Sequence, residues 1–265
     1  MPYISVVIPA FRQAAFLGDA INSVLGQTFR DWEIIVAAGD EGCRSVANSY
    51  SHEPRIRVID DGAKGNANAR NVAIEAAHSP WIVTLDADDK IGAEFLSKAL
   101  ARMERGHNII SAQLQKFGTE TSTWEIGEIT VHMLAHWHHN VLPAMALFDR
   151  ELWERSGGFE NALPCYEDWE FWAKCSQFNP HVHVIQELLY FYRRHEDNGG
   201  SACGNHGHLM AMIRALNPTV YGSLSDADRE SLRQVGGVQR DRILKRREWF
   251  PNDAHVRMLC ELIGT

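Results

Sequence analysis

Three acidic residues, Asp86, Asp88 and Asp89, directly follow a mainly apolar run at residues 81–85. The run predicts a buried strand, and the acids then lie where that strand leaves the sheet. Carboxylates held close together repel one another unless a cation joins them. Mg²⁺ typically binds one or two carboxylates together with substrate phosphates. The segment therefore indicates a metal-held phosphate substrate, and the alternative is a helix start with acidic capping residues.

The elements that would position these acids alternate between strand and helix patterns. This alternation is typical of a mostly parallel sheet with helices on both faces. Ligands of such sheets bind at the carboxyl ends of the strands, where residues 9–12, 37–41 and 86–89 would converge. That convergence favours a functional role for the acids. The predicted strands are 4–8, 32–36, 56–59 and 81–85, and the predicted helices are 17–25 and 67–77.

The second half of the chain is less regular. A Gly-Gly-Phe turn at 157–159 separates an apolar stretch from a helix with aromatic anchors. Beyond residue 206 the pattern is helical, with Pro218 and Pro251 as breaks. The predicted elements are a helix at 93–105, a strand at 109–114, a polar loop at 118–127, a helix at 167–178 and a strand at 188–192.

Composition narrows the class of protein. The chain has 265 residues, 45% of them hydrophobic, which suits one large α/β domain with a small appendage. Its net charge of −8 argues against a general nucleic-acid binder, which would usually present a basic face. The five cysteines are odd in number and form no Cys-x-x-Cys pair, so we expect no disulfide framework and a reducing cytosol.

Membrane segments are not expected. The N-terminal apolar run stops at Pro9 and is too short for a signal peptide. No stretch approaches the ~20 apolar residues that a membrane span requires. We expect a soluble cytoplasmic protein, or one that lies peripherally at the inner face of the membrane.

Short motifs follow one another in a fixed order over residues 1–202. They are 5–11, 23–25 with 27–29 and 31–36, 64–65 with 69–71, 86–88, 157–159 with 167–168, and 192–193 with His195. This ordered set resembles the family 2 glycosyltransferases, which are inverting enzymes with a GT-A fold. The resemblance implies an α/β fold with a mostly parallel mixed sheet flanked by helices. Residues 1–115 would form the nucleotide-sugar-binding half, 116–202 the acceptor-side half, and 203–265 a small helical extension.

The resemblance also implies a nucleotide-diphosphate sugar donor, a hydroxyl acceptor such as a glycan or glycolipid, and Mn²⁺ or Mg²⁺. Phe11 would stack on the base, Arg70 would hold the nucleotide, and Asp86 would approach the ribose or the metal shell. Asp88 would ligate the metal, and His195 would face the metal or the diphosphate. The other donor-binding positions would be Pro9, Ala10, Gly39, Asp40, Gly65 and Ala87.

On the acceptor side, the resemblance makes Asp168 the catalytic base, with Gly158, Glu167 and Trp169 nearby. A carboxylate within hydrogen-bond reach can take the proton of an attacking hydroxyl. Repulsion between Asp168 and Glu167 should raise the pKa of one of them. A single displacement needs no second carboxylate nucleophile, so we expect inversion. The glycine turn would bring backbone close to the sugar.

One departure concerns the base-binding segment. Family members usually carry two aspartates where this chain has Ala37 and Ala38. Either Asp40 or Glu41 substitutes for them, or the base is held in another way. A UDP-sugar is the default donor, and dTDP- and GDP-sugars are the alternatives.

Each site residue also has a structural interpretation. Asp168 would be a helix-start acid, favoured there by the helix dipole. Phe11 would belong to the core, as most aromatic residues do. His195 would be a surface histidine, and Arg70 would pair with a nearby acid such as Asp60 or Asp61.

Two other functions remain open at this point. A nucleotidyltransferase or a metal phosphohydrolase can occupy a similar sheet. A non-catalytic nucleotide-sugar-binding protein would explain the alanines at 37 and 38. Product analysis separates the enzymes, because sugar transfer releases a nucleoside diphosphate and nucleotidyl transfer releases pyrophosphate.

Two further clusters are predicted to be structural. His132, His136, His138 and His139 lack the cysteines and acids of a zinc site, so we expect a solvated or acceptor-facing loop. Residues 240–247 are basic, which usually marks a solvated helix face. The alternative is that this basic segment docks on an anionic membrane surface.

Overall fold

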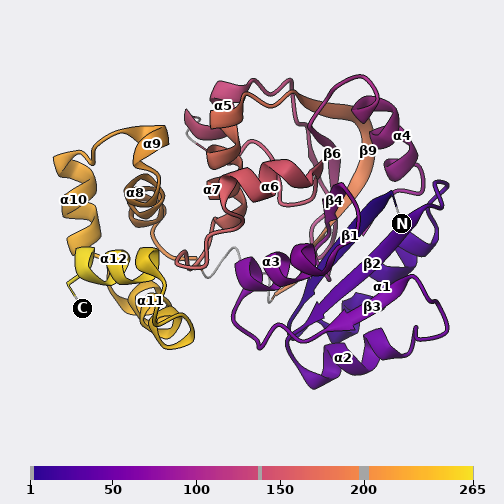
Figure 1. Cartoon of the computed structure of the whole chain (residues 1–265), viewed down its shortest axis with the longest axis horizontal. Helices are drawn as coiled ribbons and strands as arrows, with labels where there is room; N and C mark the ends of the chain where they lie inside the picture. Colours follow the sequence, from indigo (N-terminus) through magenta and orange to yellow (C-terminus); the bar gives the residue numbers. More distant parts are fainter. Residues whose placement is uncertain (1–2, 137–138, 197–202, 265) are drawn as a thin grey trace.

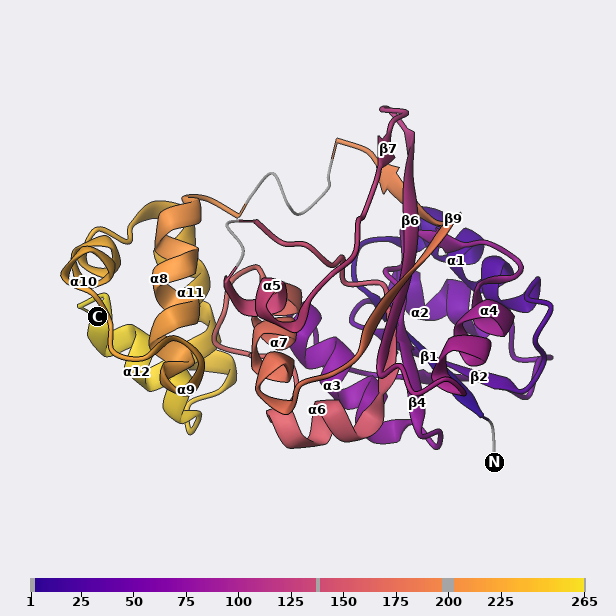
Figure 2. The ribbon, with the colours of Figure 1, turned by 90° about the horizontal axis from the view of Figure 1, so that it is seen from above.

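The computed structural model describes residues 3–136, 139–196 and 203–264, and in them one mixed sheet of nine strands. Eight strands follow the order β3-β2-β1-β4-β8-β6-β9-β5, and β7 pairs with β6 at the side. Figures 1 and 2 show the sheet at one end of the molecule and the C-terminal helices at the other. The strands are β1 (Ile4–Ala10), β2 (Trp32–Ala38), β3 (Ile56–Ile59), β4 (Trp81–Thr84), β5 (Lys90–Ile91), β6 (Ile109–Gly118), β7 (Thr123–Trp124), β8 (Leu147–Asp149) and β9 (Val182–Arg194).

The N-terminal half of the sheet is parallel. β1 lies between β2 and β4, and β3 extends the sheet beyond β2. Every residue of β1 and β2 is buried, which explains why both are almost entirely apolar apart from Ser5 and Glu33. The carboxyl ends of β1, β2 and β4 therefore meet at one edge, with the acidic run just beyond Thr84.

The other half of the sheet brings the end of β9 back to the acidic run. β8 runs antiparallel to both β4 and β6, and β9 lies between β6, to which it is parallel, and β5, to which it is antiparallel. Lys90 is paired with Phe191, so the residues after Tyr192 lie beside Asp88 and Asp89. The predicted strand at 188–192 is thus the late part of a 13-residue strand.

Helices cover both faces of the sheet (Figure 1). One face packs against α1 (Ala14–Leu25), α2 (Glu41–Asn48) and α4 (Phe95–Met103). The other face packs against α3 (Asn66–Ala76), α6 (Arg150–Ser156) and α7 (Glu167–Cys175). A short 3₁₀ helix, η1 (Ser176–Phe178), continues α7.

Two predicted loops contain regular structure, and two helices were not predicted. β7 lies inside the segment 118–127, and α5 (Val131–His136) occupies the start of the histidine-rich segment. His138 lies outside the described residues. The short helices α2 and α6 were missed because each begins at an aspartate cap next to a strand end, with few apolar positions to reveal a period.

The C-terminal helices have a core of their own, which residues 162–169 also join. Figure 2 shows these helices as a compact group beside α7. None of the described helices is long and apolar enough to cross a membrane. The helices are α8 (His206–Leu216), α9 (Pro218–Tyr221), α10 (Asp226–Arg233), α11 (Gly237–Trp249) and α12 (Ala254–Leu262).

One disulfide bond, Cys165–Cys203, joins the segment before α7 to the segment before α8, with 5.7 Å between the two Cα atoms. The expectation of no disulfide framework is therefore wrong for this pair, and the cysteines do not support a reducing compartment. The two residues are 38 positions apart and meet only because the C-terminal helices fold back on α7. Such a contact is tertiary and leaves no local pattern in the sequence.

Candidate functional site

A cavity of about 960 Å³ opens at the carboxyl ends of β1 and β4. Its wall combines the N-terminal half, the first turn of α7, the strands β6 and β9, and the helix α11. The predicted site residues that line it are Pro9, Phe11, Gly65, Arg70, Asp86, Asp88, Glu167 and Asp168. Chain segments almost a hundred residues apart thus contribute polar groups to one concave site, as in typical substrate pockets.

Arg70 links the two acidic segments of the site. Its guanidinium donates to Asp86 Oδ1 through Nη2 and to Glu167 Oε1 through Nη1, each at 2.7 Å. The side chain is only 2% exposed, so these ion pairs are shielded from solvent. Arg70 is thereby committed to Asp86 and Glu167, and the alternative pairing with Asp60 or Asp61 is wrong.

Asp88, which lines the cavity, pairs with His195, which lies outside the cavity lining. His195 Nε2 lies 2.9 Å from Asp88 Oδ2, and both side chains are mostly buried. Burial raises the pKa of Asp88, and the charge of Asp86 raises it further, although the bond to His195 opposes this. The Asp88 carboxylate is an oxygen ligand that suits Mn²⁺ or Mg²⁺, and a cation would relieve the crowding of negative charge. The residues present therefore fit a divalent ion.

Asp89 plays a different part from its two neighbours. It is fully buried and accepts hydrogen bonds from the Tyr190 hydroxyl and, at 2.7 Å, from the backbone N–H of Arg193. Arg193 also donates from Nε to the Asp88 carbonyl at 2.8 Å. Asp89 thus fastens the end of β9 to the acidic run, which holds His195 beside Asp88.

Asp168 lies in the first turn of α7, where the helix dipole favours an acid. Asn140 Nδ2 donates to Asp168 Oδ2 at 2.9 Å. Burial raises the pKa of Asp168 to about 6, and the negative charge of Glu167 adds to the effect. The pKa of Glu167 itself is lowered, because the charge and hydrogen bond of Arg70 outweigh its burial. The pKa values of these neighbouring acids are therefore shifted in opposite directions. Such a difference suits Asp168 as a proton acceptor and Glu167 as a permanently charged group.

The base-binding end of the cavity departs from the sequence prediction. Asp40 caps α2, where it accepts from the backbone N–H of Cys43 at 3.0 Å and of Arg12 at 2.6 Å. Burial alone would raise the pKa of Asp40, but these N–H donors outweigh it and lower the pKa. Asp61, after β3, also approaches this end: a Cβ on Gly39 would be 2.8 Å from Asp61 Oδ1 and 3.2 Å from the Phe11 ring. Asp61 is therefore a second acid near Gly39, although it lies outside the cavity lining, and the sequence named it only as a partner of Arg70.

Two predicted acceptor-side residues do not line the cavity. Gly158 has φ +77°, and a Cβ there would lie 2.8 Å from Asn71 Oδ1 and 3.0 Å from Trp153 Nε1. The glycine turn thus packs against α3, and the expectation that it approaches the sugar is wrong. Trp169 is 2% exposed and packs in the core of the C-terminal helices, stacked on His206. Among the donor positions, Ala10, Gly39, Asp40 and Ala87 also lie outside the cavity lining.

The sequence profile described as Glycosyl transferase family 2 matches residues 5–157, more than half of the chain. The chain belongs to the family 2 glycosyltransferases. The family prediction made from the ordered motifs is confirmed.

Relatives and solved structures agree with this membership. The chain is 26% identical to the glycosyltransferase EpsJ of Bacillus subtilis over 75% of this chain and 63% of that protein. It is 24% identical to chondroitin synthase of Escherichia coli over 75% of this chain and 30% of that protein. The chain therefore spans less than two thirds of the length of either relative.

The crystal structure of S. aureus TarS in complex with UDP-GlcNAc superposes with a TM-score of 0.69 and 16% identity, covering 95% of this chain and 73% of that one. This likeness confirms the predicted GT-A fold of the glycosyltransferase.

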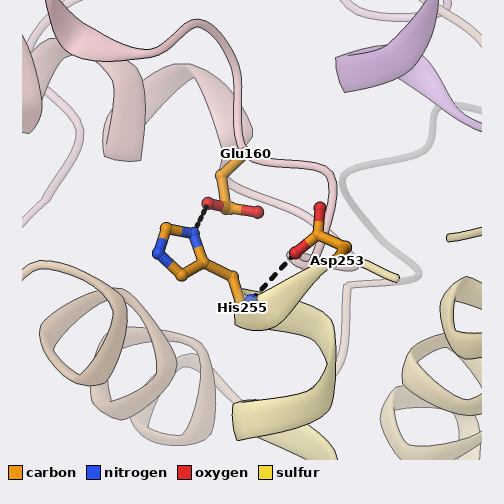
Figure 3. Close-up of side chains that lie close together, drawn as sticks. All are labelled: Glu160, Asp253 and His255. Carbon is orange, nitrogen blue, oxygen red and sulfur yellow. Dashed lines mark hydrogen bonds and ion pairs between the residues drawn. The ribbon is translucent and has the colours of Figure 1, made fainter. Parts of the chain in front are cut away.

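A second cluster of charged side chains lies apart from the cavity lining (Figure 3). The potential ligand atoms of Glu160, Asp253 and His255 lie within 4.8 Å of one another. Glu160 Oε2 is 2.6 Å from His255 Nδ1, and Asp253 Oδ1 accepts from the backbone N–H of His255 and Val256. These groups already pair with one another or with backbone N–H groups. We therefore interpret the cluster as a structural link between α12 and the loop after the glycine turn.

Several residues of the glycosyltransferase cavity were missed from sequence. Arg242, Arg246 and Trp249 of α11 reach the cavity, so the prediction of a solvated basic face is wrong for these arginines. Their spacing of three to four residues was the only signal, because it places them on one side of a helix. Tyr190, which also lines the cavity, gave no such signal.

Proposed function

We propose that this glycosyltransferase transfers a sugar from a nucleotide-diphosphate donor to a hydroxyl group of an acceptor, with inversion at the anomeric carbon. Residues 1–115 bind the donor, residues 116–202 bind the acceptor, and residues 203–265 form a helical extension. One observation carries the proposal. Asp86 and Asp88 after β4 and Asp168 on α7 line the same cavity, and the buried Arg70 bridges Asp86 to Glu167, the neighbour of Asp168.

The donor lies along the N-terminal wall of the cavity. Phe11 is 44% exposed at the rim and offers an aromatic face to the nucleotide base. Asp61, near Gly39, is the proposed acceptor for base N–H groups. Arg70 holds Asp86 in place at the point where the ribose and phosphates pass. UDP is the default nucleotide, supported by the UDP-GlcNAc complex of TarS, and dTDP and GDP are the alternatives.

Asp88 and His195 would hold Mn²⁺ or Mg²⁺. When bound, the ion supplies Lewis-acid stabilisation of the negative charge that grows on the departing diphosphate. The chain prepares this position by burying Asp88 next to His195 and by fixing both to the end of β9 through Asp89.

Asp168 is the general base. As the acceptor oxygen attacks the anomeric carbon, the bond from that carbon to the phosphate oxygen breaks, and its electron pair leaves with the nucleoside diphosphate. The hydroxyl proton passes to the Asp168 carboxylate. Asn140 orients that carboxylate, and the raised pKa of about 6 makes it a stronger base than an ordinary aspartate.

The biological setting is the synthesis of a polysaccharide, cell-surface glycan or glycolipid, supported by the likeness to chondroitin synthase. We propose that the chain works in the cytoplasm, where nucleotide sugars are the donors, with peripheral membrane contact as the alternative. A nucleotidyltransferase is disfavoured because it has no need of a base on α7, across the cavity from the acidic run.

The test is product analysis with a panel of UDP-, dTDP- and GDP-sugars, Mn²⁺ and candidate glycan acceptors. We expect release of a nucleoside diphosphate and, by NMR, a product anomer opposite to that of the donor. Release of pyrophosphate would instead support nucleotidyl transfer, and retention of the anomer would refute the single displacement.

A further inference from the structure

Two arginines of α11 reach the substrate cavity from outside the segment that the family profile covers. Arg242 and Arg246 are one helical turn apart and both line the cavity, together with Trp249. Exposed basic residues on the same helix, such as Arg247, point elsewhere. The helical extension therefore contributes a positively charged wall to a cavity whose other charged lining residues are mostly acidic.

Arg246 is the more deeply buried of the two, at 9% exposed. Its Nε has no hydrogen-bond partner among the residues that the structure describes, and Nη1 donates to the Arg242 carbonyl at 3.2 Å. Nη2 lies beside the donor segment, 3.5 Å from where a Cβ on Gly65 would be. A buried guanidinium with an unused donor is costly unless a ligand completes its hydrogen bonds.

The charged groups around Arg246 do not neutralise its positive charge. Burial lowers its pKa to about 10, and the positive charge of Arg242 acts in the same direction. Glu167 is the acid that opposes this effect, but its Oε1 already accepts from Arg70 at 2.7 Å. Arg242 donates to Cys165 Sγ at 3.3 Å, which is a weak acceptor. Two like charges thus face the cavity, and the acid that acts on Arg246, Glu167, is already paired with Arg70.

We propose that Arg242 and Arg246 form an anion subsite, which binds a carboxylate or phosphate carried by one of the two substrates. Guanidinium groups suit both anions because their fork of N–H donors matches two oxygens at once. Trp249 closes the subsite as an aromatic wall. The inference rests on the proposed function only in taking the substrates to be sugars, and it assigns a role to the helical extension.

The anion can belong to the donor sugar or to the acceptor, and two binding experiments separate these sources. The donor experiment titrates the whole chain, with Mn²⁺, by calorimetry against UDP-glucose and UDP-glucuronate, which differ only in the carboxylate. GDP-mannose and GDP-mannuronate form a second pair of the same kind. The acceptor experiment fills the donor site with UDP and Mn²⁺, and compares methyl glucoside with methyl glucuronide and glucose 6-phosphate by saturation-transfer NMR.

Arg242→Met and Arg246→Met are the test variants, and Arg247→Met is the matched control because Arg247 is exposed and lies outside the cavity lining. In one of the experiments, we expect the wild type and the control to bind the anionic probe about tenfold or more tightly than the neutral one, as one or two charge-assisted hydrogen bonds would provide. Both test variants should lose this preference. If Arg246→Met fails to fold, Arg242→Met, which is less buried, carries the test.

The inference is overturned if the wild type shows no preference for an anion in either experiment, or if both test variants keep it. Nucleotide binding without such a preference refutes the subsite and leaves the proposed function standing. Conversely, an arginine-dependent preference for methyl glucuronide in a protein that binds no nucleotide supports the subsite and refutes the proposed function.

Discussion

Two clusters in this molecule each combine carboxylates with a basic side chain, but we assign them different roles. The pocket cluster consists of Asp86, Asp88, Glu167 and Asp168 around Arg70, and it lines the large cavity. The interface cluster consists of Glu160, Asp253 and His255, and it joins α12 to the loop after the glycine turn (Figure 3). By ligand-atom spacing alone, the interface cluster is the more compact candidate for a metal site.

The two clusters differ in how completely their own hydrogen bonds and ion pairs stabilise the carboxylates. In the interface cluster, His255 and backbone N–H groups meet the carboxylates, and the pKa of Glu160 falls because these bonds outweigh its burial. In the pocket cluster, burial and neighbouring acids raise the pKa values of Asp88 and Asp168. A surplus of negative charge facing a cavity indicates a site that a cation and a substrate complete, whereas internal balance indicates a structural link.

The largest effect is expected from Asp168→Asn. Removing the proton acceptor should lower kcat by roughly 10²- to 10⁴-fold, because general-base catalysis typically contributes that much. Donor affinity, measured by calorimetry, should change little, since Asp168 lies on the acceptor side. Full activity in this variant would show that another group takes the proton.

Arg70→Met should destabilise the fold as well as abolish donor binding. Arg70 is the buried partner of Asp86 and Glu167, so its loss leaves two shielded carboxylates without a cation. We expect a loss of about 3 kcal/mol in the free energy of unfolding, measured by urea denaturation. Arg155→Met, which removes an exposed pair with Glu151, is the matched control and should cost less than about 1 kcal/mol. Equal losses in the two variants would refute the bridging role.

The pH profile of kcat/KM should report the ionisation of Asp168. The base must be ionised to accept a proton, and its pKa is raised to about 6. Activity should therefore be level above this pH and fall by up to about tenfold per unit below it. The residual activity of Asp168→Asn should lack this step. A wild-type profile that stays level down to pH 4.5 would contradict the assignment.

The smallest effect is expected from Glu160→Gln in the interface cluster. His255 is half exposed, so the ion pair is screened, and the variant should lose about 1 kcal/mol or less with unchanged activity. The pKa of Glu160 is lowered from 4.5 and that of His255 is raised from 6.5. The ion pair therefore stabilises the fold fully at pH values between 4.5 and 6.5. This stabilisation is lost as pH falls through the pKa of Glu160 in the folded protein. It is also lost as pH rises through the pKa of His255 in the folded protein. Melting temperatures of wild type and variant across pH check this, and a difference that is constant with pH would exclude the ion pair as its cause.

The sequence predicted the features that depend on residues close together along the chain. The strands β1, β2 and β4 could be found because each is a largely buried and largely apolar run, and the acids after β4 follow directly from that assignment. The approach of Asp61 to Gly39 could not be found, because it depends on how the segment after β3 folds against the end of β2. Arg242 and Arg246 look like any solvated basic face until α11 packs against the cavity. These failures all concern contacts between segments distant in sequence.

The most direct test of the account is where Mn²⁺ binds. Calorimetric titration of Mn²⁺ in the presence of UDP, dTDP or GDP compares the wild type with Asp88→Asn and with Glu160→Gln. We predict that the wild type and Glu160→Gln bind the ion with the same affinity and that Asp88→Asn loses this binding. Retention of binding in Asp88→Asn together with its loss in Glu160→Gln would contradict the assignment of the pocket cluster as the metal and substrate site.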